Sequence, residues 1–151
     1  MLISARSGIV NTEGYEKLTN GAYTVYISGI LFVRGLKAGE ESIRWMLENY
    51  SNTGMIPFDK LCGAYSILID DCERGLICFS DNSAMRGLII GEYSIGSNFL
   101  ELAKFEKHTE MNNNAICEYL TLTRCLLLDT FVKGISSTDY LSYYVLKDGK
   151  I

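Results

Sequence analysis

The sequence predicts an α+β fold with a largely antiparallel sheet, and three observations lead to that prediction. Segments 64–70 (AYSILID) and 76–79 (LICF) flank a polar turn, which is the pattern of a β-hairpin. Segment 39–50 (GEESIRWMLENY) has the apolar spacing of a helix. Hairpins alternate with a few such helices along the chain, which indicates α+β rather than a parallel sheet.

The predicted helix at 39–50 is the clearest local element. Its apolar residues recur at i, i+3, i+4 and i+7 and therefore share one face. They are Ile43, Met46, Leu47 and Tyr50. Glu40 and Glu41 stand in the first turn, where carboxylates interact favourably with the positive end of the helix dipole.

Segment 23–33 (YTVYISGILFV) is rich in β-branched and aromatic residues. It predicts either one long strand or a hairpin broken at Ser28-Gly29. Its continuous apolar end, residues 30–33, favours a strand that is buried on both faces. The alternative is a surface that a partner covers.

The remaining elements follow in order along the chain. Two further strands are expected at 85–91 and 93–97, with a short helix at 99–105 behind them. Asn112, Asn113 and Asn114 supply capping residues for a helix over 115–126, in which Ile116, Tyr119 and Leu120 have helical spacing. A last strand is expected at 140–146, followed by a turn at Asp148-Gly149.

Composition limits the classes of function. A chain of 151 residues suits one domain, so we expect a single domain over residues 1–151. The net charge is −4 and the basic residues form no run, which argues against nucleic-acid binding. The apolar runs are too short to span a bilayer and we find no signal peptide, so we expect a cytoplasmic protein without a membrane partner.

The thiols and the single imidazole do not form a recognisable reactive site. The five cysteines, Cys62, Cys72, Cys78, Cys117 and Cys125, include no C-x-x-C pair, and His108 lies in a polar stretch. We expect no metal and no cofactor, a solvated His108, and cysteines that serve as small core residues. We expect Asp70 and Asp71 to be solvated in their turn, and Tyr140, Tyr143 and Tyr144 to lie on a strand with one buried face.

One stretch has a family resemblance. Segment 58–90 (FDKLCGAYSILIDDCERGLICFSDNSAMRGLII) resembles the centre of the class II glutamine amidotransferase domain, above all the N-terminal half of asparagine synthetases. Leu61, Gly63, Asp70, Asp81, Arg86 and Leu88 stand at matching places. The helix at 39–50 is similar to the one that follows the family's S-D-T-E motif, with Glu41 on the glutamate. Segments 95–105, 112–122 and 129–150 resemble later pieces in the same order, so the match covers roughly Gly29 to Lys150.

This resemblance implies a four-layer αββα sandwich of the N-terminal-nucleophile (Ntn) hydrolase type with mostly antiparallel sheets. Its working members expose an N-terminal cysteine after Met1 is removed. The thiolate attacks the amide of glutamine, and the α-amino group acts as base. An N-G pair stabilises the oxyanion, and an R-G-P-D arginine and the S-D-T-E aspartate hold the substrate. Ammonia then passes to a separate synthetase domain.

The functional positions of this chain depart from that pattern. The nucleophile position is Leu2, and the N-G pair is matched by Ser28-Gly29. Gly39 stands where the S-D-T-E aspartate would be, and the R-D-R basic residues are matched by Ser80 and Asn82. Only 27 residues precede Ser28, so the resemblance implies a shortened N-terminal part without the R-G-P-D segment. Asp81 and Arg86 remain, and both residue types serve structure more often than chemistry.

We therefore expect a catalytically degenerate domain, with no catalytic residue, that does not act as an enzyme by itself. Its expected role is docking on an ATP-dependent, amide-forming synthetase domain or subunit, with a homodimer as an alternative assembly. A second hypothesis is an active amidotransferase or amidohydrolase whose nucleophile has moved to one of the cysteines or to Ser4 or Ser7. A third is a sensor of a small amide or amino acid.

Overall fold

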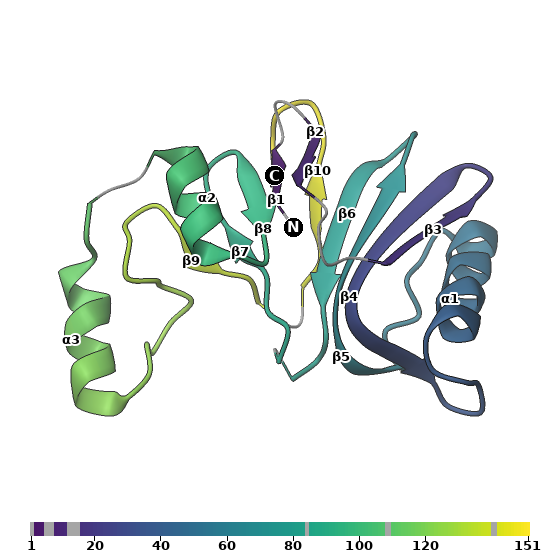
Figure 1. The fold of residues 1–151 in the computed structure, drawn as a ribbon, viewed down its shortest axis with the longest axis horizontal. Coiled ribbons are helices and arrows are strands. Elements are labelled where there is room, and N and C mark those ends of the chain that lie inside the picture. The colour runs from purple at the N-terminus through teal and green to yellow at the C-terminus, as the bar shows by residue number, and fades with distance from the viewer. Residues whose placement is uncertain (1, 5–7, 12–15, 84, 108–109, 140–141) are drawn as a thin grey trace.

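The computed structural model describes residues 2–4, 8–11, 16–83, 85–107, 110–139 and 142–151, and for residues 2–4 and 8–11 it describes the backbone alone. Within this part of the chain the fold is mixed α/β, with three helices and two antiparallel sheets (Figure 1). The first sheet, called the β4 sheet, has the order β10-β6-β5-β4-β3. The second, called the β8 sheet, has the order β2-β1-β8-β7-β9. None of the described helices has the length and apolar character needed to cross a membrane.

The β4 sheet is built around the predicted hairpin. Its strands are β3 (Glu16–Asn20), β4 (Tyr23–Val33), β5 (Leu61–Asp71), β6 (Gly75–Ser80) and β10 (Tyr144–Leu146). Segment 23–33 forms one continuous strand that pairs with β5 along its whole length, from Tyr23 opposite Asp71 to Val33 opposite Leu61. The hairpin of β5 and β6 is confirmed, with Asp71 opposite Gly75 beside the turn.

The β8 sheet consists of shorter strands. They are β1 (Leu2–Ser4), β2 (Gly8–Asn11), β7 (Ile89–Ile90), β8 (Ser94–Gly96) and β9 (Ser136–Ser137). The strands expected at 85–91 and 93–97 exist but are reduced to β7 and β8. Residues 81–83, 85 and 86 lie in a loop instead, called the 81–86 loop, because the backbone N–H groups of Ser83, Met85 and Arg86 bond to the Asp81 side chain.

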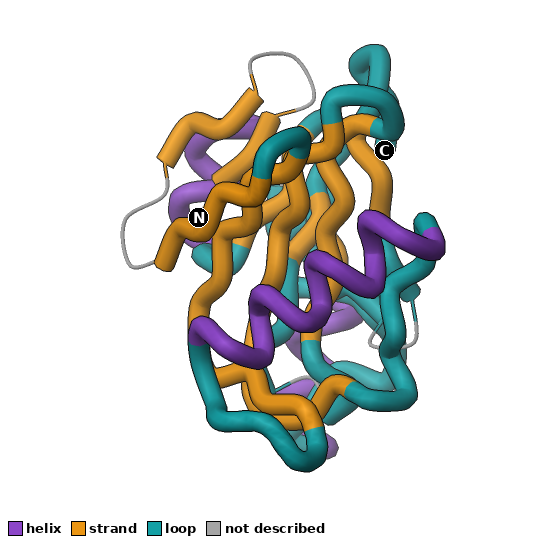
Figure 2. The backbone as a smooth tube through the Cα atoms, turned by 90° about the vertical axis from the view of Figure 1, so that its right-hand side faces the viewer, coloured by secondary structure: helices purple, strands orange, loops and turns teal. Residues whose placement is uncertain are grey.

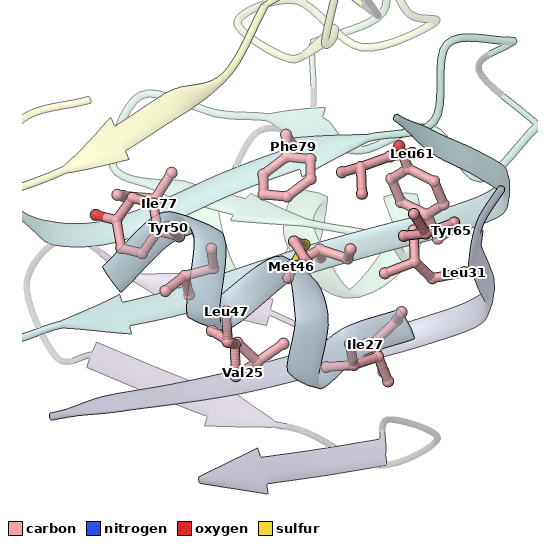
Figure 3. Packing of buried hydrophobic residues seen from close by; sticks show 14 residues of the cluster. Val25, Ile27, Leu31, Met46, Leu47, Tyr50, Leu61, Tyr65, Ile77 and Phe79 are labelled. Carbon is pink, nitrogen blue, oxygen red and sulfur yellow. The ribbon is translucent and has the colours of Figure 1, made fainter. Parts of the chain in front are cut away.

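Helix α1 (Glu40–Thr53) covers the outer face of the β4 sheet and crosses its strands in Figure 2. All four apolar residues predicted for its inner face are buried, together with Ser42. They pack against alternate residues of β4, β5 and β6, including Val25, Tyr65 and Phe79 (Figure 3). Gly54 ends the helix with φ of +67°, a conformation that glycine adopts without steric cost.

Two further apolar clusters connect the remaining layers. Leu68 and Cys78 of the β4 sheet pack with Leu88 and Ile95, which belong to the β7–β8 region. Helix α2 (Phe99–Glu106) is capped by Asn98 and packs Leu102 against Val132 and Ile135 on the other side of the β8 sheet. The two sheets therefore lie between α1 and α2 (Figure 1).

Helix α3 (Asn113–Leu122) confirms the predicted helix and its cap, since the Asn112 side chain accepts a hydrogen bond from Ala115 N at 3.3 Å. It ends at Leu122, short of the predicted end at residue 126, because Thr123 adopts a left-handed conformation with φ of +59°. It lies at the left-hand end of the molecule, beyond α2 (Figure 1). Ala115 is its one buried residue. The expected stripe on this helix is therefore not a core face.

Several burial expectations are wrong. Strand β4 alternates at its end: Leu31 and Val33 are buried, whereas Ile30 and Phe32 are 62% and 42% exposed. The run is thus not buried on both faces, because only one face of the sheet is covered here. Asp71 is buried rather than solvated, and it accepts hydrogen bonds from the Tyr50 hydroxyl and from the backbone of the turn.

The thiols and the tyrosines also need correction. Of the five cysteines only Cys78 is buried, because it alone points into the cluster between the sheets. The last strand is shortened to Tyr144–Leu146 within the described residues. Tyr144 is half-buried while Tyr143 is exposed, so one side of this pair faces the protein. His108 and Tyr140 lie outside the described residues.

Candidate functional site

Three of the residue positions predicted from the sequence meet at one place beside β4 and β5. Ser28 lies on β4 directly opposite Ser66 of β5. Side chains alternate along a strand, so both serines point away from α1, toward the side of the β8 sheet. The loop of residues 81–86 reaches this place from the end of β6 and carries Asp81 and Arg86.

Asp81 is fully buried and organises that loop. Its Oδ1 accepts hydrogen bonds from Ser83 N at 2.9 Å, Ser83 Oγ at 2.5 Å and Met85 N at 3.2 Å. Its Oδ2 accepts from Arg86 N at 2.9 Å and Tyr65 N at 3.3 Å. Burial opposes ionisation, but the bonds from Ser83, Arg86 and Met85 outweigh it and lower the pKa of Asp81. The carboxylate is thus held ionised by backbone donors, with both oxygens engaged.

Arg86 is exposed, and its guanidinium lies over Ser28. Nη1 donates to Ser28 Oγ across 3.5 Å, at the long limit of a hydrogen bond. The Arg86 carbonyl in turn accepts a hydrogen bond from the Ser66 hydroxyl. Arg86 forms no ion pair with a described residue. A guanidinium cannot remove a proton from a hydroxyl, so Ser28 is not activated as a nucleophile by this neighbour.

The two glycines of the predicted site have backbone roles. Gly29 has φ of +102°, and a Cβ there would stand 2.1 Å from the Ala64 carbonyl oxygen. Only glycine allows β4 and β5 to approach this closely. Gly39 lies on the loop that enters α1, with φ of +84°, and its N–H donates to the Leu31 carbonyl at 2.9 Å. It belongs to the start of α1, and its positive φ would strain an aspartate.

Leu2 lies in the other sheet. Its backbone belongs to β1, where it pairs with Gly96 of β8 and with Asn11 of β2. The structure therefore brings together Ser28, Asp81 and Arg86, keeps Gly29 beside them in β4, and places Gly39 and Leu2 on other elements. Among the described residues no group of three or more His, Cys, Asp or Glu side chains could hold a metal ion.

A second feature of the molecule is an exposed apolar surface on α3 and the segment that follows it, which we call the α3 surface. Leu120 and Leu127 are 77% and 76% exposed. Its other large apolar members, all exposed, are Tyr119, Leu122, Leu126, Leu128 and Phe131. The rings of Tyr119 and Phe131 make an edge contact with centroids 5.1 Å apart, which connects the helix to the following segment. Tyr119, Leu127 and Phe131 line a groove of about 500 Å³ between the helix and this segment.

Seven large apolar residues are exposed on this one part of the molecule, and their number calls for an explanation. Scattered exposed leucines are normal, but a contiguous apolar patch on a folded protein marks an interaction site. Charged residues of both signs, among them Glu118 and Arg124, occur in the same segment, and Glu118 Oε2 accepts a hydrogen bond from Leu126 N at 3.0 Å. The α3 surface thus combines exposed apolar side chains with charged residues of both signs close by in the chain.

Sequence reasoning missed several of these residues. Ser66 and the α3 surface were not predicted as functional, although the run Leu126-Leu127-Leu128 was visible as an apolar segment. Only the burial of Ala115 and the exposure of its neighbours show that the apolar residues of α3 face outward.

No family model, curated protein or solved structure matches the chain.

Proposed function

We propose that this chain is a docking domain: a catalytically silent class II glutamine amidotransferase-like domain that binds an ATP-dependent, amide-forming synthetase. The observation that carries the docking role is the α3 surface, whose leucines remain in contact with solvent. Burying a leucine side chain contributes roughly 1.5–3 kcal/mol, so covering several of them would stabilise a complex.

The arrangement of layers supports the amidotransferase-like part of the proposal. Apolar clusters lie between α1 and the β4 sheet, between the two sheets, and between the β8 sheet and α2. That order is the one an αββα sandwich of the Ntn-hydrolase type requires. It agrees with the resemblance of segment 58–90, which supplies β5, β6 and β7.

The chemistry of the predicted site supports the absence of glutamine hydrolysis. Asp81 has both oxygens occupied by donors, and Ser28 has an arginine rather than a base beside it. General-base activation of a hydroxyl or thiol needs a proton acceptor within hydrogen-bond reach. Arg86 and Ser28 can offer donors to a carboxylate or amide, which is a binding role.

A cytoplasmic location is part of this proposal. The five cysteines are all free thiols, and three of them, Cys62, Cys72 and Cys117, are exposed. Free exposed thiols persist in a reducing compartment and tend to be oxidised outside it.

The first test is ammonia release from glutamine by the purified chain. We expect a rate equal to that of the blank, and no mass increase with a glutamine analogue that alkylates thiols. Cys62→Ser is the matched control, because Cys62 is the exposed thiol on the strand that carries Ser66. If the chain hydrolysed glutamine and Cys62→Ser abolished that activity, the proposal would be wrong and the chain would be an enzyme with a relocated nucleophile.

The second test is complex formation with the asparagine synthetase-type enzymes of the source organism, measured by light scattering after size-exclusion chromatography. We expect a complex that Leu120→Asp with Leu127→Asp abolishes. Met85→Asp is the control, since Met85 is equally exposed but lies on the 81–86 loop, outside the α3 surface. Self-association that the same double variant abolishes would assign the surface to a homodimer and contradict the proposed partner.

A further inference from the structure

A hollow of about 340 Å³ lies on the outer face of the β4 sheet, beyond the end of α1. Its walls come from three separate parts of the chain: Tyr50 and the segment after α1, Arg74 and Ile77 of the β5–β6 hairpin, and Tyr143 before β10. Tyr50 and Ile77 stand at the same end of the core cluster in Figure 3. The volume is at the lower end of the range of small-molecule sites.

Aromatic and aliphatic side chains form most of the wall. Phe58 and Tyr143 stack with ring centroids 6.3 Å apart and an interplanar angle of 25°. Phe58 is also fixed from behind by an edge contact with the buried Phe79 at 5.1 Å. Met55, on the rim, is exposed and can adapt its shape to a ligand. This wall fits a flat or branched apolar group.

Arg74 supplies a positive charge in the same hollow. Its Nη1 donates to the Gly54 carbonyl, and its Cζ lies 5.7 Å from the centre of the Tyr50 ring. Two contacts therefore hold the guanidinium in place. A Cβ on Gly54 would stand 2.5 Å from Nη2, so the glycine leaves the room in which the guanidinium lies. Arg74 forms no ion pair with a described residue. Its guanidinium also interacts with the Tyr50 hydroxyl, and the N–H donors beyond these contacts are left for a ligand.

The nearby acid, Asp71, does not occupy those groups. Its oxygens accept hydrogen bonds from the Tyr50 hydroxyl at 2.5 Å, Glu73 N at 2.8 Å and Arg74 N at 3.0 Å. Its negative charge partly offsets Arg74 at longer range. Lys147, whose Nζ donates to the Glu73 carbonyl at 2.6 Å, adds positive charge on the other side of the turn.

We propose that this hollow binds a small organic acid with an apolar body, an aryl- or branched alkyl-carboxylate. The carboxylate pairs with Arg74, and the apolar body lies against Phe58 and Tyr143. This site is separate from the α3 surface and from the Ser28–Arg86 pair, so the inference stands independently of the proposed function.

The test is an NMR titration of the ¹⁵N-labelled full chain with 3-phenylpropionate and, as its neutral match, 3-phenylpropionamide. We expect amide shifts at residues 54–56, 58, 74–77 and 143–145, and a Kd for the carboxylate at least about fivefold lower than for the amide. Arg74→Gln removes that preference. Arg44→Gln, at an exposed arginine on α1, leaves it unchanged. Tyr143→Ala weakens both probes.

The proposal can be tested even if the Arg74→Gln variant does not fold. In the wild-type chain, raising NaCl from 50 to 500 mM weakens binding of the carboxylate and not of the amide, because salt screens a charge pair. Shifts elsewhere in the chain, equal affinity for the two probes, or a carboxylate affinity that neither salt nor Arg74→Gln changes would overturn the proposal.

Discussion

Helices α1 and α3 have similar apolar spacing but opposite surroundings. In α1 the residues at i, i+3, i+4 and i+7 are buried against the β4 sheet. In α3 the corresponding residues, Ile116, Tyr119 and Leu120, are half-buried or exposed. The difference shows that periodicity determines which residues share a helix face, whereas the neighbouring elements determine whether that face is buried in the fold or stays in contact with solvent.

The largest expected effect comes from making the same leucine-to-alanine substitution once in each of the two helices. Leu47→Ala in α1 removes a fully buried side chain and should lower the free energy of unfolding by about 2–5 kcal/mol. Leu120→Ala in α3 should change it by less than about 0.5 kcal/mol. Both are leucine-to-alanine changes within a helix, so helix propensity is matched. Urea denaturation measures both, and a loss above 2 kcal/mol for Leu120→Ala would show that α3 belongs to the core.

An intermediate effect on the free energy of unfolding is expected from Asp81, the carboxylate that organises the 81–86 loop. Asp81→Asn replaces one acceptor oxygen by a donor, so at least two of its buried bonds are lost. We expect the free energy of unfolding to fall by roughly 2–3 kcal/mol at pH 7. Replacing an apolar residue of the α3 surface by Gln, Asn or Ser should give no such loss, because those residues are exposed.

The same carboxylate predicts a pH dependence. Hydrogen bonds lower the pKa of Asp81 in the folded state, and likewise that of Asp71 against the opposing effect of burial. The unfolded chain therefore takes up protons first as the pH falls. The stabilisation is complete well above pH 4, the ordinary aspartate pKa, and is lost progressively below it. Thermal unfolding between pH 7 and pH 3 should show this loss, and Asp81→Asn should make it shallower; an identical profile would contradict the role of Asp81.

The smallest expected effect distinguishes two buried tyrosines, Tyr50 of α1 and Tyr65 of β5. Tyr50 donates to Asp71, and burial together with that bond raises the pKa of Tyr50 to about 12. Tyr50→Phe should therefore cost about 1–2 kcal/mol. Tyr65 has a buried hydroxyl that finds no hydrogen-bond partner among the described residues. Tyr65→Phe should be neutral or slightly stabilising, and a cost equal to that of Tyr50→Phe would show that a partner exists.

The sequence by itself determined the local elements of this protein. Helix α1, the β5–β6 hairpin, the cap at Asn112 and helix α2 follow from spacing and capping residues, because these depend on neighbours a few positions away. Strand β4 could be recognised but not its continuity, since the positive φ of Gly29 is maintained by pairing with β5, which is more than 30 residues further along the chain.

Only the tertiary structure decided what is buried and which side chains meet. It buries Asp71 beside Tyr50, exposes Ile30 and Phe32, and brings Arg86 over Ser28. It also gathers Arg74, Phe58 and Tyr143 around one hollow. These outcomes depend on contacts between segments that are remote in sequence, and the apolar pattern of one segment carries no record of what will cover it.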